Sequence, residues 1–235
     1  FMQVGTVART RLARIRSDGT VDPVWNADAS ATVYALARSG STVYVGGSFS
    51  NIGEQTRRYI AALDATTGET KVWAPNATHT VRALAVSGDG STVYAGGDFT
   101  AIGGQSRNHI AALNATTGAA TGWNPDANAT VRALKVSGTT VYAGGNFNTI
   151  GGQPRTGIAA LSTMTGTANI FWDAAADGTV HALALSGSTV YVGGSFSNMG
   201  GQPRHFIAAL DSTFGSASTW NPVANSTVYD IEVSG

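Results

Sequence analysis

One stretch of thirteen residues occurs twice in this chain with a single change. Residues 41–53 read STVYVGGSFSNIG, and residues 188–200 read STVYVGGSFSNMG. Five tryptophans keep a nearly constant step of 48, 50, 49 and 48 residues, and they are Trp25, Trp73, Trp123, Trp172 and Trp220. The same step is kept by five phenylalanines, Phe1, Phe49, Phe99, Phe147 and Phe196. The chain is therefore a tandem array, and its fold has to repeat as well.

Each unit is expected to contain four short strands, as residues 80–123 illustrate. Residues 80–87 (TVRALAVS) are rich in β-forming side chains, and residues 91–99 follow after a tight turn, so the two predict a hairpin. Residues 109–114 form a third strand that a turn at Gly118 closes, and residues 119–123 form a fourth before an Asn-Pro step. No segment has the spacing of an amphipathic helix. Four antiparallel strands per unit are typical of propeller blades, with a β-solenoid or a sandwich as alternatives.

The repeated wording also resembles a known family. A glycine pair after an apolar strand, then a tryptophan 26 residues later followed by proline, resembles the kelch repeat. The fuller pattern, VYVGGSFSNIG followed by Gln, Arg, IAALDATTG, Trp and Pro, is similar to kelch-like propeller repeats of bacterial surface and exported proteins. The resemblance covers essentially the whole chain and implies the fold far more than any activity. The first unit departs most, with Val7 where the others have glutamine, so we expect it to pack less regularly.

We therefore predict one all-β domain over residues 1–235, a β-propeller of five blades. The units are 1–48, 49–98, 99–146, 147–195 and 196–235. The array begins at the end of a second strand and stops after a first strand at 226–235. The ends are expected to share a closing blade that is short by one strand, which would hide the sheet edges. The alternative is an arc of a six- or seven-bladed ring. A chain that starts with Phe1 is expected to be a piece of a longer, multidomain protein.

Composition excludes several classes of partner. Lysine plus arginine equals aspartate plus glutamate, the net charge is zero and charged residues make up 12% of the chain, so no basic field favours nucleic acid or an anionic membrane. There are no cysteines, which excludes disulfides and thiolate metal sites. No apolar run reaches the length of a membrane span. We expect no nucleic acid, no membrane insertion and no cofactor.

The loops divide between two faces. The turns between first and second strands and between third and fourth strands are tight, whereas the other face carries the longer loops, where function tends to reside. On that face the innermost strand has a variable residue after its Thr-Val pair. We expect these side chains at the channel mouth, where they form either a polar-aromatic pocket for a sugar or an acidic group, or a plug that excludes solvent. They are Tyr34, Arg82, Arg132, His181 and Tyr229.

One arginine also recurs in every unit. Its guanidinium is expected to hold loop carbonyls from two adjacent blades, and the alternative is a ring of positive charge for an anionic ligand. The five are Arg9, Arg57, Arg107, Arg155 and Arg204. The tryptophans are expected in the core between blades rather than in sugar stacking.

Catalytic chemistry is sparse. Glycoside hydrolysis needs two carboxylates that flank the substrate, but only Asp230 and Glu232 are acidic on an inner strand, and they share one face. The four histidines occupy non-equivalent positions, and neither a metal-ligand spacing nor a nucleophile elbow occurs. Asp98 and its counterparts after the glycine pairs would bind Ca²⁺ only by coincidence of geometry.

The sequence thus predicts a non-catalytic interaction or adhesion scaffold within a larger exported bacterial protein. It would be extracellular or at the cell surface and would bind a protein or a surface glycan through the loop-bearing face. A lectin-like module with one site per blade is the first alternative. A propeller hydrolase or lyase is the second.

Overall fold

The computed structural model describes residues 1–234, and within them it contains strands, turns and loops but no helix. Four units each form a three-stranded antiparallel sheet with the second strand in the middle. The strands are β3 (Val33–Ser39), β4 (Thr42–Gly47) and β7 (Ile60–Asp64); β8 (Val81–Val86), β9 (Thr92–Gly97) and β12 (Ile110–Asn114); β13 (Val131–Ser137), β14 (Thr140–Gly145) and β17 (Ile158–Ser162); and β18 (Thr179–Ser186), β19 (Thr189–Ser195) and β22 (Ile207–Asp211).

The expected fourth strand of each unit is reduced to one antiparallel bridge to the third strand. These bridges are Leu63↔Thr70, Leu113↔Ala120, Leu161↔Ala168 and Leu210↔Ala217. The segment is too short to extend the ladder, because a tight turn precedes it and the tryptophan turns away from the sheet a few residues later. The four-strand prediction is therefore wrong for the fourth element, which is an extended edge segment.

A small hairpin that the sequence did not predict lies between the second and third strands of each unit. The pairs are β1 (Gln3–Val4) with β2 (Val7–Ala8), β5 (Asn51–Ile52) with β6 (Gln55–Thr56), β10 (Ala101–Ile102) with β11 (Gln105–Ser106), β15 (Thr149–Ile150) with β16 (Gln153–Pro154), and β20 (Asn198–Met199) with β21 (Gln202–Pro203). A buried apolar residue such as Ile52 or Met199 anchors the hairpin to the core. The longer loop is thus an ordered element.

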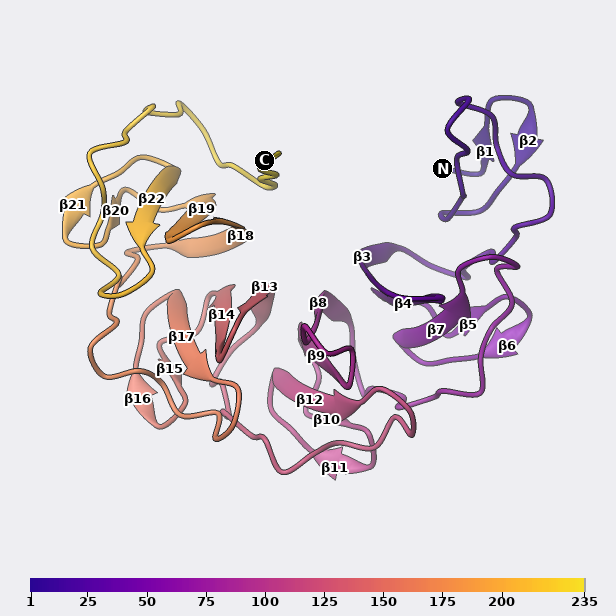
Figure 1. The fold of residues 1–235 in the computed structure, drawn as a ribbon, viewed down its shortest axis with the longest axis horizontal. Coiled ribbons are helices and arrows are strands. Elements are labelled where there is room, and N and C mark those ends of the chain that lie inside the picture. The colour runs from indigo at the N-terminus through magenta and orange to yellow at the C-terminus, as the bar shows by residue number, and fades with distance from the viewer. Residues whose placement is uncertain (235) are drawn as a thin grey trace.

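The sheets are arranged as a fan around a common centre (Figure 1). The first strands β3, β8, β13 and β18 lie innermost, and successive ones contact each other. The small hairpins lie at the periphery, and the two termini lie at the two ends of the arc. This is the arrangement of a propeller.

The glycine pairs set the spacing between neighbouring sheets. A Cβ at Gly96 would lie 2.6 Å from Cγ1 of Val131 on the next inner strand, and a Cβ at Gly46 would lie 2.8 Å from Cγ1 of Val81. Both valines are fully buried. The first glycine of each pair therefore makes room for a valine of the next sheet.

The tryptophans link successive units by hydrogen bonds. Four of the five indole N–H groups donate to a backbone carbonyl at the end of the next unit's third strand, whereas Trp220, which no further sheet follows, is 42% exposed and departs from the predicted core position. The pairs are Trp25 to Asp64 (3.3 Å), Trp73 to Asn114 (3.0 Å), Trp123 to Ser162 (2.8 Å) and Trp172 to Asp211 (3.1 Å). These four rings are almost fully buried, as expected for residues of a core between blades.

The two ends of the arc are less complete. Residues 1–25 contain β1, β2 and a bridge between Ile15 and Val21, while residues 226–234 form no strand, and Gly235 lies outside the described residues. Val228 nevertheless packs on Gly193 as the other valines pack on their glycines. The expected shared blade is not confirmed, because within residues 1–234 no strand pair or bridge joins residues 1–25 to residues 226–234. None of these residues forms a helix with the length and apolar character needed to cross a membrane.

Candidate functional site

A β-bulge opens every inner strand. Val33 faces Gly47 and Ala35 faces Gly46, so Tyr34 is an extra residue without a partner on β4. The same irregularity isolates Arg82, Arg132 and His181 on the following inner strands. A bulge turns a side chain away from the regular alternation of the strand. The variable residue of each unit is thus released from the sheet and can face the channel.

The structure brings all five variable residues together. Tyr34, Arg82, Arg132, His181 and Tyr229 line one hollow of about 360 Å³ between the inner strands. Asp230 and Glu232 line it as well, and both are exposed. The hollow is open to solvent, since Tyr34 is 50% and Tyr229 is 74% exposed.

Adjacent side chains pair around this hollow. The Arg82 guanidinium carbon lies 5.2 Å from the centre of the Tyr34 ring, a distance at which a cation is attracted to the ring face. The rings of His181 and Tyr229 have their centres 5.2 Å apart. The hollow therefore has an aromatic side chain at each end of the inner-strand series and cations between them.

Asp98 does not line the hollow but holds Arg82, which does, and the sequence analysis did not select it for this role. Its carboxylate accepts hydrogen bonds from Arg82 Nε (2.9 Å) and from the Thr130 hydroxyl (2.8 Å), and Arg82 Nη2 lies 2.8 Å away. Burial of Asp98 raises its pKa, but the hydrogen bonds from Arg82 and Thr130 outweigh that effect and hold the pKa below its usual value. Asp98 thus joins two successive units and neutralises Arg82.

Arg132 has no such partner. It forms no ion pair within the described residues. Its buried Nε lacks an acceptor, as does that of each recurring arginine, but unlike theirs its terminal nitrogens also donate no hydrogen bond within residues 1–234. Burial and the nearby charge of Arg82 lower the pKa of Arg132, and burial and the charge of Arg132 lower that of His181. Arg132 is therefore a cation with unused donors beside a second arginine. The arrangement suits an anionic group, above all a carboxylate, which accepts two N–H bonds from a guanidinium.

The recurring arginines are arranged differently. In each, one terminal nitrogen donates to the carbonyl of the preceding residue and the other donates to a carbonyl 14 residues further on. The second bonds run from Arg9 to Pro23, Arg57 to Lys71, Arg107 to Thr121, Arg155 to Asn169 and Arg204 to Ser218, at 2.6–3.0 Å. Both carbonyls belong to the same unit, so these guanidiniums join the small hairpin to the edge segment of one blade rather than two adjacent blades. Three of the five, Arg9, Arg155 and Arg204, are buried.

Known proteins share this architecture. The family model described as outer membrane protein assembly factor BamB matches residues 6–217. None of the curated proteins matches the sequence. The matching family is not that of the kelch repeats that the sequence resembles, although both build propellers.

Among solved structures, the computationally designed Ika8 protein is similar with a TM-score of 0.55 and 16% identity, over 87% of this chain and 66% of that one. The Pan2 WD40 domain of Neurospora crassa has a TM-score of 0.52 and 17% identity, over 80% of this chain and 51% of that one. BamB from Moraxella catarrhalis has a TM-score of 0.47 and 22% identity, over 79% and 46%. The chain spans less than two thirds of the length of these structures. The likeness to the Pan2 WD40 domain shows that this chain shares the propeller fold. At 17% identity it shows the fold alone.

Proposed function

The chain belongs to the family of outer membrane protein assembly factor BamB, and on that premise we propose that it is a non-catalytic scaffold for protein interaction in a bacterial cell envelope. The partner binds at the channel mouth on the loop-bearing face. The scaffold is a module of a larger exported protein. The family's name, which describes assembly rather than turnover, supports this choice over an enzyme.

The unpaired Arg132 carries the proposal. A guanidinium with unused donors beside Arg82 favours an acidic group that enters the hollow. The exposed rings of Tyr34 and Tyr229 offer apolar contact around that group. We therefore assign the partner an acidic segment, with a glutamate or aspartate side chain inserted next to Arg132.

The closing arrangement of the ring is part of the same proposal. The ring has five blades, and its last blade combines the inner strand at residues 226–234 with the edge segments of residues 1–25. Two observations support it: Val228 packs on Gly193 in the manner of the other inner strands, and Tyr34 and Tyr229, from opposite ends of the arc, line the same hollow.

Site-specific photo-crosslinking tests the proposed binding face. A benzophenone amino acid replaces Tyr34 at the hollow or, as the control, Val72, which is 95% exposed on an outer edge segment. We expect one discrete protein adduct from position 34, lost when Arg132→Glu is added, and no such adduct from position 72. Equal adducts from both positions, or adducts that Arg132→Glu leaves unchanged, would contradict the proposal.

The glycan and enzyme alternatives have their own test. A glycan array probed with the purified chain should show no sugar whose binding depends on the hollow. Binding of a sugar that Arg132→Glu abolishes would replace the protein partner by a glycan. Hydrolysis or lyase turnover that depends on Asp230 or Glu232 would refute the non-catalytic assignment.

A further inference from the structure

A smaller hollow, the Arg58 hollow, lies at one end of the sheet of β3, β4 and β7. Its volume is about 400 Å³, and it is lined by Ser50, Arg58, Tyr59, Asn76, Ala77 and Thr78, none of which is acidic. Ala35 of β3 and Ile60 of β7 both face Gly46 of β4. The residues that precede them, Tyr34 and Tyr59, therefore lie at the same end of the sheet. The Arg58 hollow is thus on the face that carries the channel mouth.

The exposure of Arg58 is a property of the repeat. Its equivalents in the next two units are Asn108 and Thr156, and both are exposed, although sheets flank them on either side. This position is therefore open to solvent inside the array as well as near its ends.

The repeat also shows which side chain lies next to this position. It comes from the loop before the next inner strand, three residues after the tryptophan, and in the first and third units it is aspartate. Asp28 accepts a hydrogen bond from the backbone N–H of Thr10 (2.6 Å), and Asp126 accepts one from the side-chain amide of Asn108 (2.8 Å). In the second unit Asn76 accepts a bond from the backbone N–H of Arg58 (3.0 Å). Aspartate thus fits this position as well as asparagine does.

Arg58 is the one arginine in this series, and it lies beside the amide rather than beside an aspartate. Within residues 1–234 its guanidinium forms no ion pair and donates no hydrogen bond. An aspartate in place of Asn76 would keep the backbone bond, as Asp28 does, and would add an ion pair with Arg58. The chain instead leaves this guanidinium available for a carboxylate from outside.

Tyr59 provides a second indication of binding. Its backbone φ is +67°, in the left-handed region that bulky residues rarely adopt. The equivalent Gly157 has the same conformation, with a φ of +73°, so the fold does not require a side chain here. A tyrosine kept at a strained position indicates a use for its ring. That ring lines the Arg58 hollow and stacks on the ring of His79, with the centres 6.0 Å apart.

A series of contacts joins the Arg58 hollow to the channel mouth. Tyr59 stacks on His79, and Nδ1 of His79 lies 3.7 Å from Oδ2 of Asp98. The same carboxylate oxygen lies 2.8 Å from Nη2 of Arg82, which lines the channel mouth. An extended segment bound at the channel mouth can therefore cross His79 and Tyr59 and reach Arg58.

We infer that the Arg58 hollow is a second subsite for the partner, and that it binds a second carboxylate of the same acidic segment. The guanidinium of Arg58 pairs with this carboxylate, and the ring of Tyr59 contacts the methylene groups beside it. The inference rests on the proposed function, since the segment is the one assigned to Arg132. It adds that the segment carries acidic residues at two separate places along its length.

Binding of decaglutamate to the whole chain tests the inference. Ten extended residues span about 33 Å, so one peptide can extend from the channel mouth to a neighbouring loop. Fluorescence anisotropy of the labelled peptide at low salt gives the affinity, and isothermal titration calorimetry gives the stoichiometry. We expect one peptide per chain and an affinity that falls about threefold to fivefold in Arg58→Ser, as for an exposed ion pair. Asn76→Asp should weaken binding at least as much, because its carboxylate pairs with Arg58 from within the chain.

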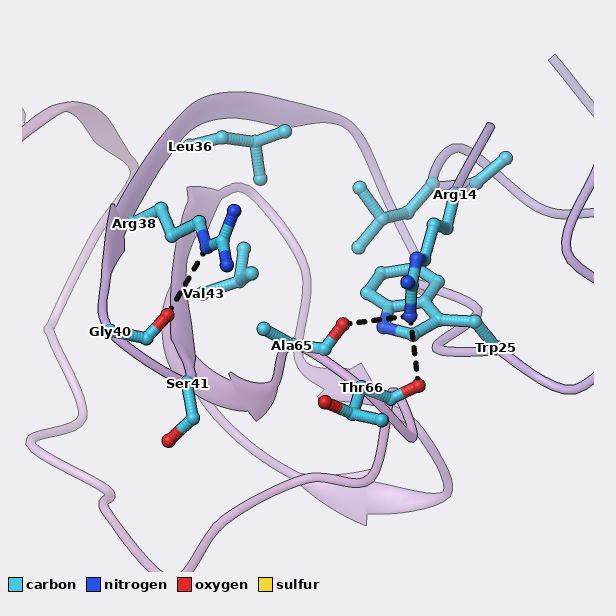
Figure 2. A pocket seen from close by; sticks show the side chains of 11 residues that line it. Arg14, Trp25, Leu36, Arg38, Gly40, Ser41, Val43, Ala65 and Thr66 are labelled. Atoms are coloured by element: carbon cyan, nitrogen blue, oxygen red, sulfur yellow. Dashed lines mark hydrogen bonds between the residues drawn. The ribbon is translucent and has the colours of Figure 1, made fainter. Parts of the chain in front are cut away.

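Three control variants separate the subsite from a general effect of charge. Arg38→Ser removes an exposed arginine on the opposite face, where Nε of Arg38 donates to the carbonyl of Gly40 (3.1 Å, Figure 2). Val72→Asp adds the same charge as Asn76→Asp on an exposed outer segment. Asn108→Ser alters the equivalent of Arg58 in the next unit. All three should leave the affinity nearly unchanged.

Three results would overturn the inference. These are a loss in Arg58→Ser no greater than in Arg38→Ser, a loss in Asn76→Asp no greater than in Val72→Asp, or two peptides bound per chain. The last would make the Arg58 hollow a separate anion site. Arg132→Gln tests the proposed function instead. Unchanged binding in Arg132→Gln, while Arg58→Ser still weakens it, would refute the site at the channel mouth, whereas the reverse pattern would refute only the second subsite.

Discussion

The close approach of Gly96 to Val131 makes a quantitative prediction about the interface between successive blades. Alanine at position 96 places its Cβ 2.6 Å from Cγ1 of Val131, which is too close for any real contact. Neither partner can withdraw freely, since Val131 is fully buried between the sheets. Overpacking of this kind lowers the stability of a core by about 1–3 kcal/mol.

A second substitution, at Val131, removes the side-chain atom that the new Cβ at position 96 would meet, and the two substitutions together form a double-mutant cycle. Val131→Ala deletes two methyl groups from a fully buried side chain, which costs about 1.6 kcal/mol of transfer free energy and more for the cavity. In the double variant the new methyl group at position 96 enters the space that Val131 has left. The two losses should therefore not add, and we expect the double variant to be more stable than their sum by about 1 kcal/mol or more.

Urea unfolding of the parent, the two single variants and the double variant measures this coupling. Gly97→Ala is the control, because a Cβ there meets the backbone carbonyl of Thr80 in its own unit, and Val131→Ala cannot relieve that clash. Strict additivity of Gly96→Ala and Val131→Ala would refute the packing of the second strand against the next inner strand. Equal rescue of Gly97→Ala by Val131→Ala would refute it as well.

Three further predictions concern polar groups. Arg155→Gln removes the bonds to the carbonyls of Pro154 and Asn169, and urea unfolding should show a loss of about 1–3 kcal/mol; no loss would refute the structural role of this arginine. The pKa of His181, followed by NMR, should lie below its usual value and rise in Arg132→Gln, since that variant removes a repelling charge; an unchanged pKa would contradict their proximity. The pKa of Asp98 is lowered in the folded chain, so its carboxylate stabilises the fold above about pH 4, and this contribution is lost as the pH falls through the folded pKa. The melting temperatures of the parent and Asp98→Asn should therefore converge on acidification, and a constant difference would refute the assignment.

The repeat predicts the architecture well because its landmarks are packing residues. A tryptophan, a phenylalanine and a glycine pair recur at one step only if the same contacts recur, and the structure buries four of the five tryptophans and four of the five phenylalanines, with Phe1 and Trp220 at the two ends exposed. The length of the fourth strand was overestimated, because β propensity does not indicate where a chain leaves the hydrogen-bonded ladder of its sheet. The small hairpins were missed, since their strands are two residues long.

The site was predictable in part. Variation at a fixed position selected the residues that line the hollow, but strand periodicity cannot reveal that a bulge isolates them. Asp98 was passed over, although it is the one acidic residue at a position that holds Ser48, Asn146 and Ser195 in other units. That difference signals its pairing with Arg82.

The response of the Arg132 side chain to an acidic peptide tests the proposed function most directly. The Nε–H signals of the arginines are followed in a nitrogen–proton NMR spectrum while tetraglutamate is added, with tetraglutamine as the uncharged control. We predict that the Arg132 signal shifts with tetraglutamate, whereas those of Arg57 and Arg107, whose terminal nitrogens already donate to backbone carbonyls, do not. An Arg132 signal that stays fixed, or that responds equally to tetraglutamine, would contradict an acidic partner at the channel mouth.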